Sequence, residues 1–159
     1  MSATSGGMTL WQPGDSVSVH LTADDSGEVA QHNHGVELTG EGDDHPTAAL
    51  TSAAGNGVGR ITEMPDEYDD SASYSAGEVV GVASISINGR VEWLPPSDDW
   101  EPGTTGTQDA AVGDDVVFDN GGTVKAHETE DALAVIGRVW TTVARDYGQL
   151  GNVAVLRYR

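Results

Sequence analysis

The feature of the sequence that most limits how this chain can fold is a pair of short β-branched segments separated by residues 120–122, Asn-Gly-Gly. Asn-Gly favours a hairpin turn, because both central residues of the turn must accept positive φ angles and these two do so at little cost. Residues 115–119 and 123–126 are therefore predicted to form antiparallel strands. Alternation along a strand places Val116 and Phe118 on one face.

Short apolar segments and turns recur along the rest of the chain. Residues 77–88 form a strong strand pattern, and Asn88-Gly89 predicts a second hairpin with residues 90–94. The sequence VGRIT at 58–62 is echoed by IGRVW at 136–140, which suggests duplicated β units. Helical periodicity is hard to find. We therefore predict an all-β fold, a small β-barrel or sandwich built from hairpins.

The 159 residues are long enough for one domain with a sizeable core. Residues 1–13 are small and polar until Leu10 and Trp11, and we expect them to form an extended N-terminal arm. Residues 14–159 are expected to form a single β domain. Two long acidic loop excursions, at 64–76 and 95–109, interrupt the strand pattern because they are rich in Asp, Ser, Pro and Gly.

The charge balance is extreme. The chain has 26 Asp plus Glu against 7 Lys plus Arg, a net charge of -19, and Lys125 is its only lysine. At about 0.15 M salt the Debye length of roughly 8 Å leaves much of the resulting repulsion unscreened, whereas in molar salt it shrinks to about 3 Å. We therefore interpret the chain as halophilic. An acidic protein that binds cations or a basic partner is the alternative.

The same composition argues against several classes of function. Nucleic-acid binding needs cations to neutralise phosphates, and this chain has few. No apolar run approaches the roughly 18 residues of a membrane-spanning helix, and the N-terminus lacks the basic and apolar regions of a secretory signal. The absence of cysteine excludes disulfides but does not indicate a compartment.

One cluster has the character of metal ligands. Residues 28–38 can form a strand pair around residues 33–35. His32 and His34 are two residues apart, so on one strand their side chains would point the same way, and His45 follows nearby. Their spacing partly resembles the first histidine motif of cupins. A divalent cation bound by His32, His34 and His45 is therefore one hypothesis; a solvated polar strand or a subunit contact is the other. No organic cofactor is expected, only a divalent cation or salt ions.

The sequence offers little support for an enzyme. With 26 carboxylates, a suggestive Asp or Glu pair is expected by chance alone. No Gly-x-Ser-x-Gly elbow occurs, and the glycine-rich residues 55–59 precede no helix with a phosphate-binding lysine. We predict that the chain is not an enzyme.

Several short motifs follow one another along the chain: GDSV at 14–17, HGVE at 34–37, GVA at 81–83, AVGDDV at 111–116, a turn before Val124, IGRV at 136–139 and VAV at 153–155. Their order resembles a known family, the small capsid decoration proteins of tailed viruses that carry the uncharacterised domain numbered 2190. The resemblance implies a small β-barrel that forms trimers on an HK97-type head lattice. The two acidic excursions and the halophilic composition depart from the family pattern, which leaves a host-facing role open.

The expected function is therefore structural. The chain would be a decoration, cement or turret subunit on the outside of the capsid of a tailed haloarchaeal virus, a homotrimer that binds the major capsid protein. A cupin-like metal-binding protein and another tail or fibre subunit are the alternatives. Large aromatics often dominate interfaces, so the expected contacts are Leu10, Trp11, Trp93 and Trp100. For Trp140 a core position is equally open.

Overall fold

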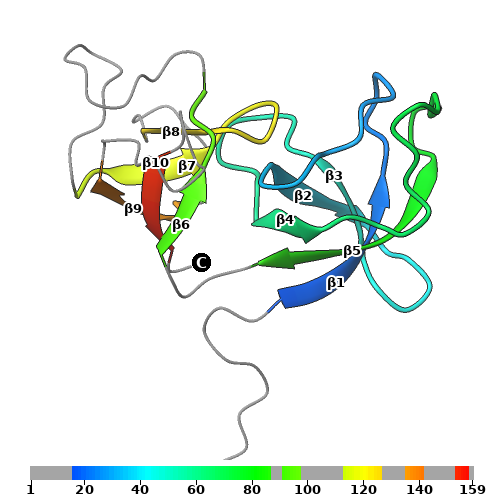
Figure 1. Ribbon diagram of the computed structural model, residues 1–159, viewed down its shortest axis with the longest axis horizontal. Helices are drawn as coiled ribbons and strands as arrows, with labels where there is room; N and C mark the ends of the chain where they lie inside the picture. The colour runs from blue at the N-terminus through cyan, green and yellow to red at the C-terminus, as the bar shows by residue number, and fades with distance from the viewer. Residues whose placement is uncertain (1–15, 87–90, 98–112, 127–134, 142–152, 158–159) are drawn as a thin grey trace, which may run out of the picture.

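The computed structural model describes residues 16–86, 91–97, 113–126, 135–141 and 153–157. These residues contain no helix and form ten strands in two groups, a closed five-stranded barrel and a second five-stranded sheet (Figure 1). The prediction of an all-β fold that includes a β-barrel is confirmed. The predicted arm at 1–13 and residues 98–109 of the second excursion lie outside the described residues.

The barrel is made from the first half of the chain, in the strand order β1-β3-β2-β4-β5. Pairing of β1 with β5 closes it, and every pair is antiparallel except the parallel pair β1–β3. Alternate small aliphatic side chains fill its interior, among them Leu21, Val36 and Ile61, each fully buried. The strands are β1 (Ser16–Thr22), β2 (Gly35–Gly40), β3 (Thr47–Leu50), β4 (Gly59–Glu63) and β5 (Val79–Ser86).

The second sheet is antiparallel throughout, in the order β6-β10-β9-β7-β8. The predicted hairpin at Asn120 is confirmed, since β7 pairs with β8 in the register Phe118↔Val124 and both Gly121 and Gly122 have positive φ. Val116 and Phe118 are buried together in the core of this sheet. Its strands are β6 (Val91–Leu94), β7 (Asp115–Phe118), β8 (Val124–Ala126), β9 (Gly137–Thr141) and β10 (Val153–Arg157).

The segment after β6 covers the outer edge of this sheet. Pro96 forms a parallel bridge with Val124 of β8. The amide of Ser97 donates to the carbonyl of Val124 at 2.8 Å, and the amide of Val124 donates to the carbonyl of Pro95 at 2.9 Å. Residues 95–97, which follow the edge strand β6, thus hydrogen-bond to β8, the strand at the opposite edge of the same sheet.

The hairpin predicted at Asn88-Gly89 is wrong. Strand β5 belongs to the barrel and β6 to the second sheet, so residues 87–90, which lie outside the described residues, connect the two groups. The reason is that β5 already has a partner on each side, β1 and β4, and closure of the barrel leaves no edge for β6 to join.

Glycines allow the second sheet to approach the barrel closely. The amide of Gly35 donates to the carbonyl of Gly122 at 2.7 Å, and the amide of Gly55 donates to the carbonyl of Phe118 at 2.8 Å. The Phe118 ring lies so close to Gly35 and Gly57 that a Cβ atom at either position would overlap it. The β7–β8 hairpin is therefore fixed on the barrel by backbone hydrogen bonds and by the packing of one aromatic ring.

Candidate interaction surface

The outer side of the second sheet presents apolar side chains to solvent. Trp140 is 57% exposed, and Val91 and Leu156 are each 37% exposed. Val91 is paired directly with Leu156, and Leu156 is paired with Arg138. Because Arg138 and Trp140 are two residues apart on β9 and both exposed, they lie on the same side of the strand. We call these four residues, Val91, Arg138, Trp140 and Leu156, the sheet face.

A charged pair borders the sheet face. The Nε atom of Arg138 lies 3.4 Å from a carboxylate oxygen of Asp115 on the neighbouring strand β7, and both side chains are well exposed. Exposed pairs of this kind add little to stability, typically less than about 1 kcal/mol. In a binding surface, such a charged pair mainly orients the partner and disfavours partners of the wrong charge.

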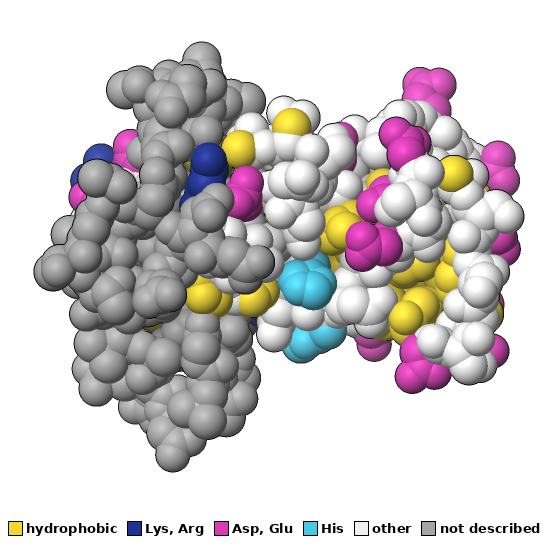
Figure 2. Space-filling view, turned by 90° about the horizontal axis from the view of Figure 1, so that it is seen from above, with side chains coloured by type: hydrophobic (Ala, Val, Ile, Leu, Met, Phe, Trp, Pro, Cys, Tyr) yellow, Lys and Arg dark blue, Asp and Glu magenta, His cyan; other side chains and the backbone are white. Residues whose placement is uncertain are grey.

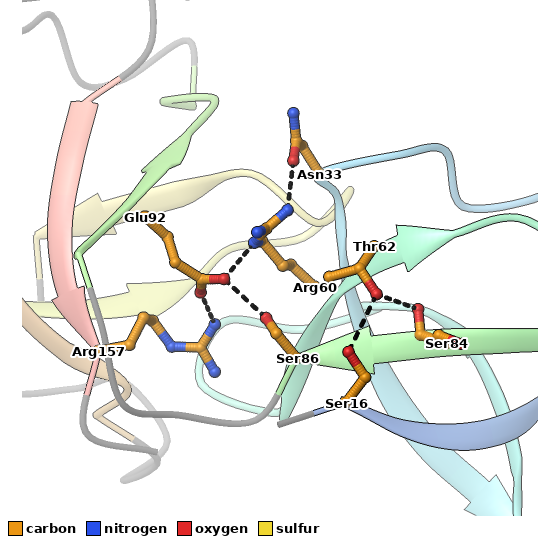
Figure 3. Close-up of polar contacts among 8 residues, drawn as sticks. All are labelled: Ser16, Asn33, Arg60, Thr62, Ser84, Ser86, Glu92 and Arg157. Carbon is orange, nitrogen blue, oxygen red and sulfur yellow. Dashed lines mark hydrogen bonds and ion pairs between the residues drawn. The ribbon is translucent and has the colours of Figure 1, made fainter. Parts of the chain in front are cut away.

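A buried ionic cluster holds this sheet against the barrel (Figure 3). Glu92 of β6 is only 3% exposed, and both its oxygens are engaged. Arg157 of β10 donates from Nη1 to Oε1 at 2.7 Å, while Arg60 of β4 and Ser86 of β5 donate to Oε2, Ser86 at 2.9 Å. Arg60 also donates to the side-chain oxygen of Asn33 at 2.6 Å. Strands β4 and β5 of the barrel and β6 and β10 of the second sheet thus meet at the Glu92 carboxylate. We call this contact the junction.

The electrostatics of the cluster depend on that carboxylate. Burial lowers the pKa of Arg157, and the charge and hydrogen bond of Glu92 oppose this shift. The guanidinium carbon of Arg157 also lies 5.4 Å from the centre of the Phe118 ring, a cation–π distance. Removing Glu92 would leave two guanidinium groups in or near the junction without their shared counter-charge.

The contacts predicted from the sequence are only partly within the described residues. Leu10, Trp11 and Trp100 lie outside them, and so does the side chain of Trp93, whose backbone pairs with Ala154 in β6–β10. Trp140, for which a core position was left open, is exposed. The alternation in GRVWT at 137–141 indicates this exposure, since it places Trp140 on the side of the charged Arg138 and opposite Val139.

The three histidines of the metal hypothesis are not brought together. The strand expected to carry His32 and His34 is absent, because residues 32 and 33 form a turn in which Asn33 has a φ of 74°. His34 is half-buried at the start of β2, where burial lowers its pKa and the charge of Glu28 opposes the shift. His45 lies in the loop beyond the other end of β2.

His45 instead neighbours His20 of β1, with ring centres 5.6 Å apart. The Nε2 atoms of His20 and His45 lie 3.1 Å and 4.0 Å from the two oxygens of Asp44. These contacts lower the pKa of Asp44, the hydrogen bond from His20 being the main cause. Within the described ranges, no group of three or more His, Asp or Glu side chains is placed to hold a metal ion.

A cavity of about 450 Å³ opens on the barrel beside β3. Its polar groups largely bond one another. The Thr39 and Thr47 hydroxyls lie 2.9 Å apart, and one oxygen of Glu37 accepts hydrogen bonds from the amide and hydroxyl of Ser52. The hydroxyl of Thr51, which also lines the cavity, is buried without a hydrogen-bond partner.

Comparisons with family models, with curated proteins and with solved structures found no match for this chain. The part of the chain that the structure describes contains no helix long and apolar enough to cross a membrane. Function is therefore inferred from the residues of this chain, and the feature that most needs explanation is the exposed tryptophan of the sheet face.

Proposed function

We propose that this chain is a structural virion protein, a decoration or cement subunit that binds the outside of a tailed-virus capsid. The observation that carries the proposal is the sheet face, on which Trp140 stands exposed beside Val91 and Leu156. The motifs shared with the capsid decoration family and the small β-barrel support it. In this proposal the subunit is a homotrimer and its partner is the major capsid protein.

An exposed tryptophan is a typical source of binding energy. Hot-spot residues contribute about 2 kcal/mol or more when truncated, and tryptophan is among the commonest of them. A specific contact buries about 800 Å² on each partner. A subunit that spans two capsomers adds such a contact, which must break before the capsomers separate under the pressure of the packaged genome.

The charge of the chain fits a surface exposed to concentrated salt. With a net charge of -19, the subunit repels its own copies strongly at low ionic strength. In molar salt the Debye length of about 3 Å confines this repulsion to near contact, so many copies can occupy one shell. The proposed host environment is therefore hypersaline, as in a virus of halophilic archaea.

The test is binding of the purified full-length chain to empty heads that lack it, at molar salt, by co-sedimentation. Saturable binding and an increased resistance of the heads to heat are the expected results. Sedimentation equilibrium of the free chain in the same buffer measures its oligomeric state. Absence of binding to the heads would reject the proposal.

A further inference from the structure

Asn-Gly pairs occur in the chain at 56–57, 88–89 and 120–121. The first and the last of them lie where the barrel contacts the β7–β8 hairpin, and the pair at 88–89 lies outside the described residues. Asn-Gly is the dipeptide in which an asparagine side chain loses its amide most readily, because glycine has no Cβ atom to hinder attack by its own backbone nitrogen. The two pairs at the contact differ in whether that nitrogen is available.

The backbone nitrogen of Gly121 is engaged, whereas that of Gly57 is not. The N–H of Gly121 donates to the carbonyl of Thr51 at 2.9 Å. The N–H of Gly57 donates to no group among the described residues. Both asparagine side chains are exposed, so water reaches each of them. Attack on Asn120 therefore has to break a hydrogen bond first, and attack on Asn56 does not.

We propose that Asn56 is a site of spontaneous deamidation in the folded chain, and that the hydrogen bond of Gly121 protects Asn120. The Gly57 nitrogen loses its proton to solvent and bonds to Cγ of Asn56, while the bond from Cγ to the side-chain nitrogen breaks and that nitrogen leaves as ammonia. Water then opens the succinimide ring at either of its carbonyl carbons, which gives aspartate or isoaspartate at position 56. Amide and water thus become carboxylate and ammonium, with nothing oxidised or reduced. The reaction needs only water, so it does not depend on the proposed capsid function.

Isoaspartate at position 56 changes the contact with the second sheet, because it lengthens the main chain by one carbon. The Gly55 amide donates to the carbonyl of Phe118 at 2.8 Å, and a Cβ atom on Gly57 would lie 2.6 Å from Cβ of Phe118. An added carbon between these two glycines shifts one relative to the other, so we expect the β7–β8 hairpin to be held less firmly.

The charge that either product adds is a smaller change. Asp and Glu side chains are already spread over the barrel half of the surface in Figure 2. In molar salt a further charge is screened within about 3 Å. Aspartate at position 56 should therefore affect stability much less than isoaspartate does.

The first experiment is a peptide map of the full-length chain by mass spectrometry, after incubation at mildly alkaline pH in molar salt. In the folded chain we expect Asn56 to deamidate about fivefold or more faster than Asn120, which is the factor that one net hydrogen bond gives. In denaturant the two sites should react at similar rates, because neither nitrogen is then held. Equal rates in the folded chain, faster reaction at Asn120, or no reaction at Asn56 while the unfolded chain reacts would each overturn the proposal.

Denaturant unfolding, followed by Trp fluorescence, tests the effect on the hairpin. After the same incubation the unfolding midpoint of the parent chain should fall more than that of Asn56→Gln, because glutamine closes the corresponding larger ring far more slowly. Fresh Asn56→Asp carries the new charge without the added main-chain carbon, and it should unfold close to the fresh parent chain. If the incubated parent chain contains isoaspartate at position 56 and its midpoint falls no more than that of Asn56→Gln, the expected loosening of the hairpin is wrong.

Discussion

The barrel and the second sheet are each built from five strands, but they are stabilised differently. The barrel closes on itself around small aliphatic side chains, with no aromatic residue in its buried cluster. The core of the second sheet includes Phe118, the only phenylalanine of the chain, and that ring packs against glycines of the barrel. The barrel thus completes its own pairing and core, whereas the second sheet uses the barrel as part of its support.

This difference shows where an extremely acidic chain places its few cations. The single Arg of the barrel, Arg60, pairs across the junction with Glu92 of the second sheet, and Arg157 of the second sheet binds the other oxygen of the same carboxylate. We therefore expect changes at the junction to destabilise the second sheet more than the barrel. Trp fluorescence reports this directly, because residues 16–86 contain no tryptophan.

The largest effect is expected from Glu92→Ala. It removes the carboxylate that Arg60 and Arg157 share, and removing one partner of a buried ion pair costs about 3–5 kcal/mol. Denaturant unfolding at constant salt, followed by Trp fluorescence, measures the loss. Barrel amides should retain more of their protection in hydrogen exchange than amides of the second sheet.

Glu41→Ala is the matched control, since Glu41 is exposed on the barrel. Its effect should stay within about 0.5 kcal/mol. If Glu92→Ala costs no more than this control, the ionic cluster does not hold the two parts together.

A smaller effect is expected from Gly35→Ala, whose new methyl group would overlap the Phe118 ring. Overpacking of this kind costs about 1–3 kcal/mol. Gly40→Ala on the same strand is the control, because its Cβ would meet nothing closer than 3.4 Å. In the double variant Gly35→Ala with Phe118→Leu, the two losses of unfolding free energy should not add. Additive losses in that double-mutant cycle would show that the ring and the glycine are not in contact.

The smallest effect concerns pH. The pKa of His34 is below its ordinary value of 6.5 because the ring is partly buried beside the junction. The unfolded chain therefore takes up a proton at His34 before the folded chain does, so this contribution to stability is present above pH 6.5 and is lost as pH falls through the folded pKa. The carboxylates of Asp24, Asp44 and Asp69 have lowered pKa values, and their contributions are lost only below about pH 3.8.

Unfolding midpoints at about pH 7.5 and 5.5 bracket the relevant range. His34→Gln should reduce the difference between them, while His32→Gln, at an exposed position, should leave it unchanged. If the difference between the two unfolding midpoints is unchanged in His34→Gln, the pH dependence comes from another group.

Local signals in the sequence predicted much of the secondary structure. Asn120-Gly121 identified its hairpin because a turn requiring positive φ depends on adjacent residues only. The echo of Gly-Arg at 59–60 and 137–138 falls at the first residues of β4 and β9, one strand in each sheet. A strand pair around residues 33–35 was predicted, and the chain does turn there, at residues 32 and 33. The metal hypothesis was wrong in keeping His32 and His34 on one strand.

Long-range features were not predictable from one sequence. Asn88-Gly89 has the same local signal as Asn120-Gly121, yet the strands on its two sides belong to different sheets, since partners far along the chain decide the pairing. Glu92 is separated from Arg60 by 32 positions and from Arg157 by 65, so nothing near it in the sequence indicated that it is buried. The sheet face follows from alternation only once the buried side of β9 and β10 is known.

The Pro96–Val124 bridge has a consequence for crowding. An exposed strand edge is a template on which another chain can add a strand, and so a starting point for fibres. The barrel has no edge, and the segment with Pro96 covers β8. In the part of the chain that the structure describes, this leaves β6 as the remaining outer strand, four residues long and followed by two prolines. Within the described residues, β6 is therefore the one outer strand to which another copy could add a strand by backbone pairing.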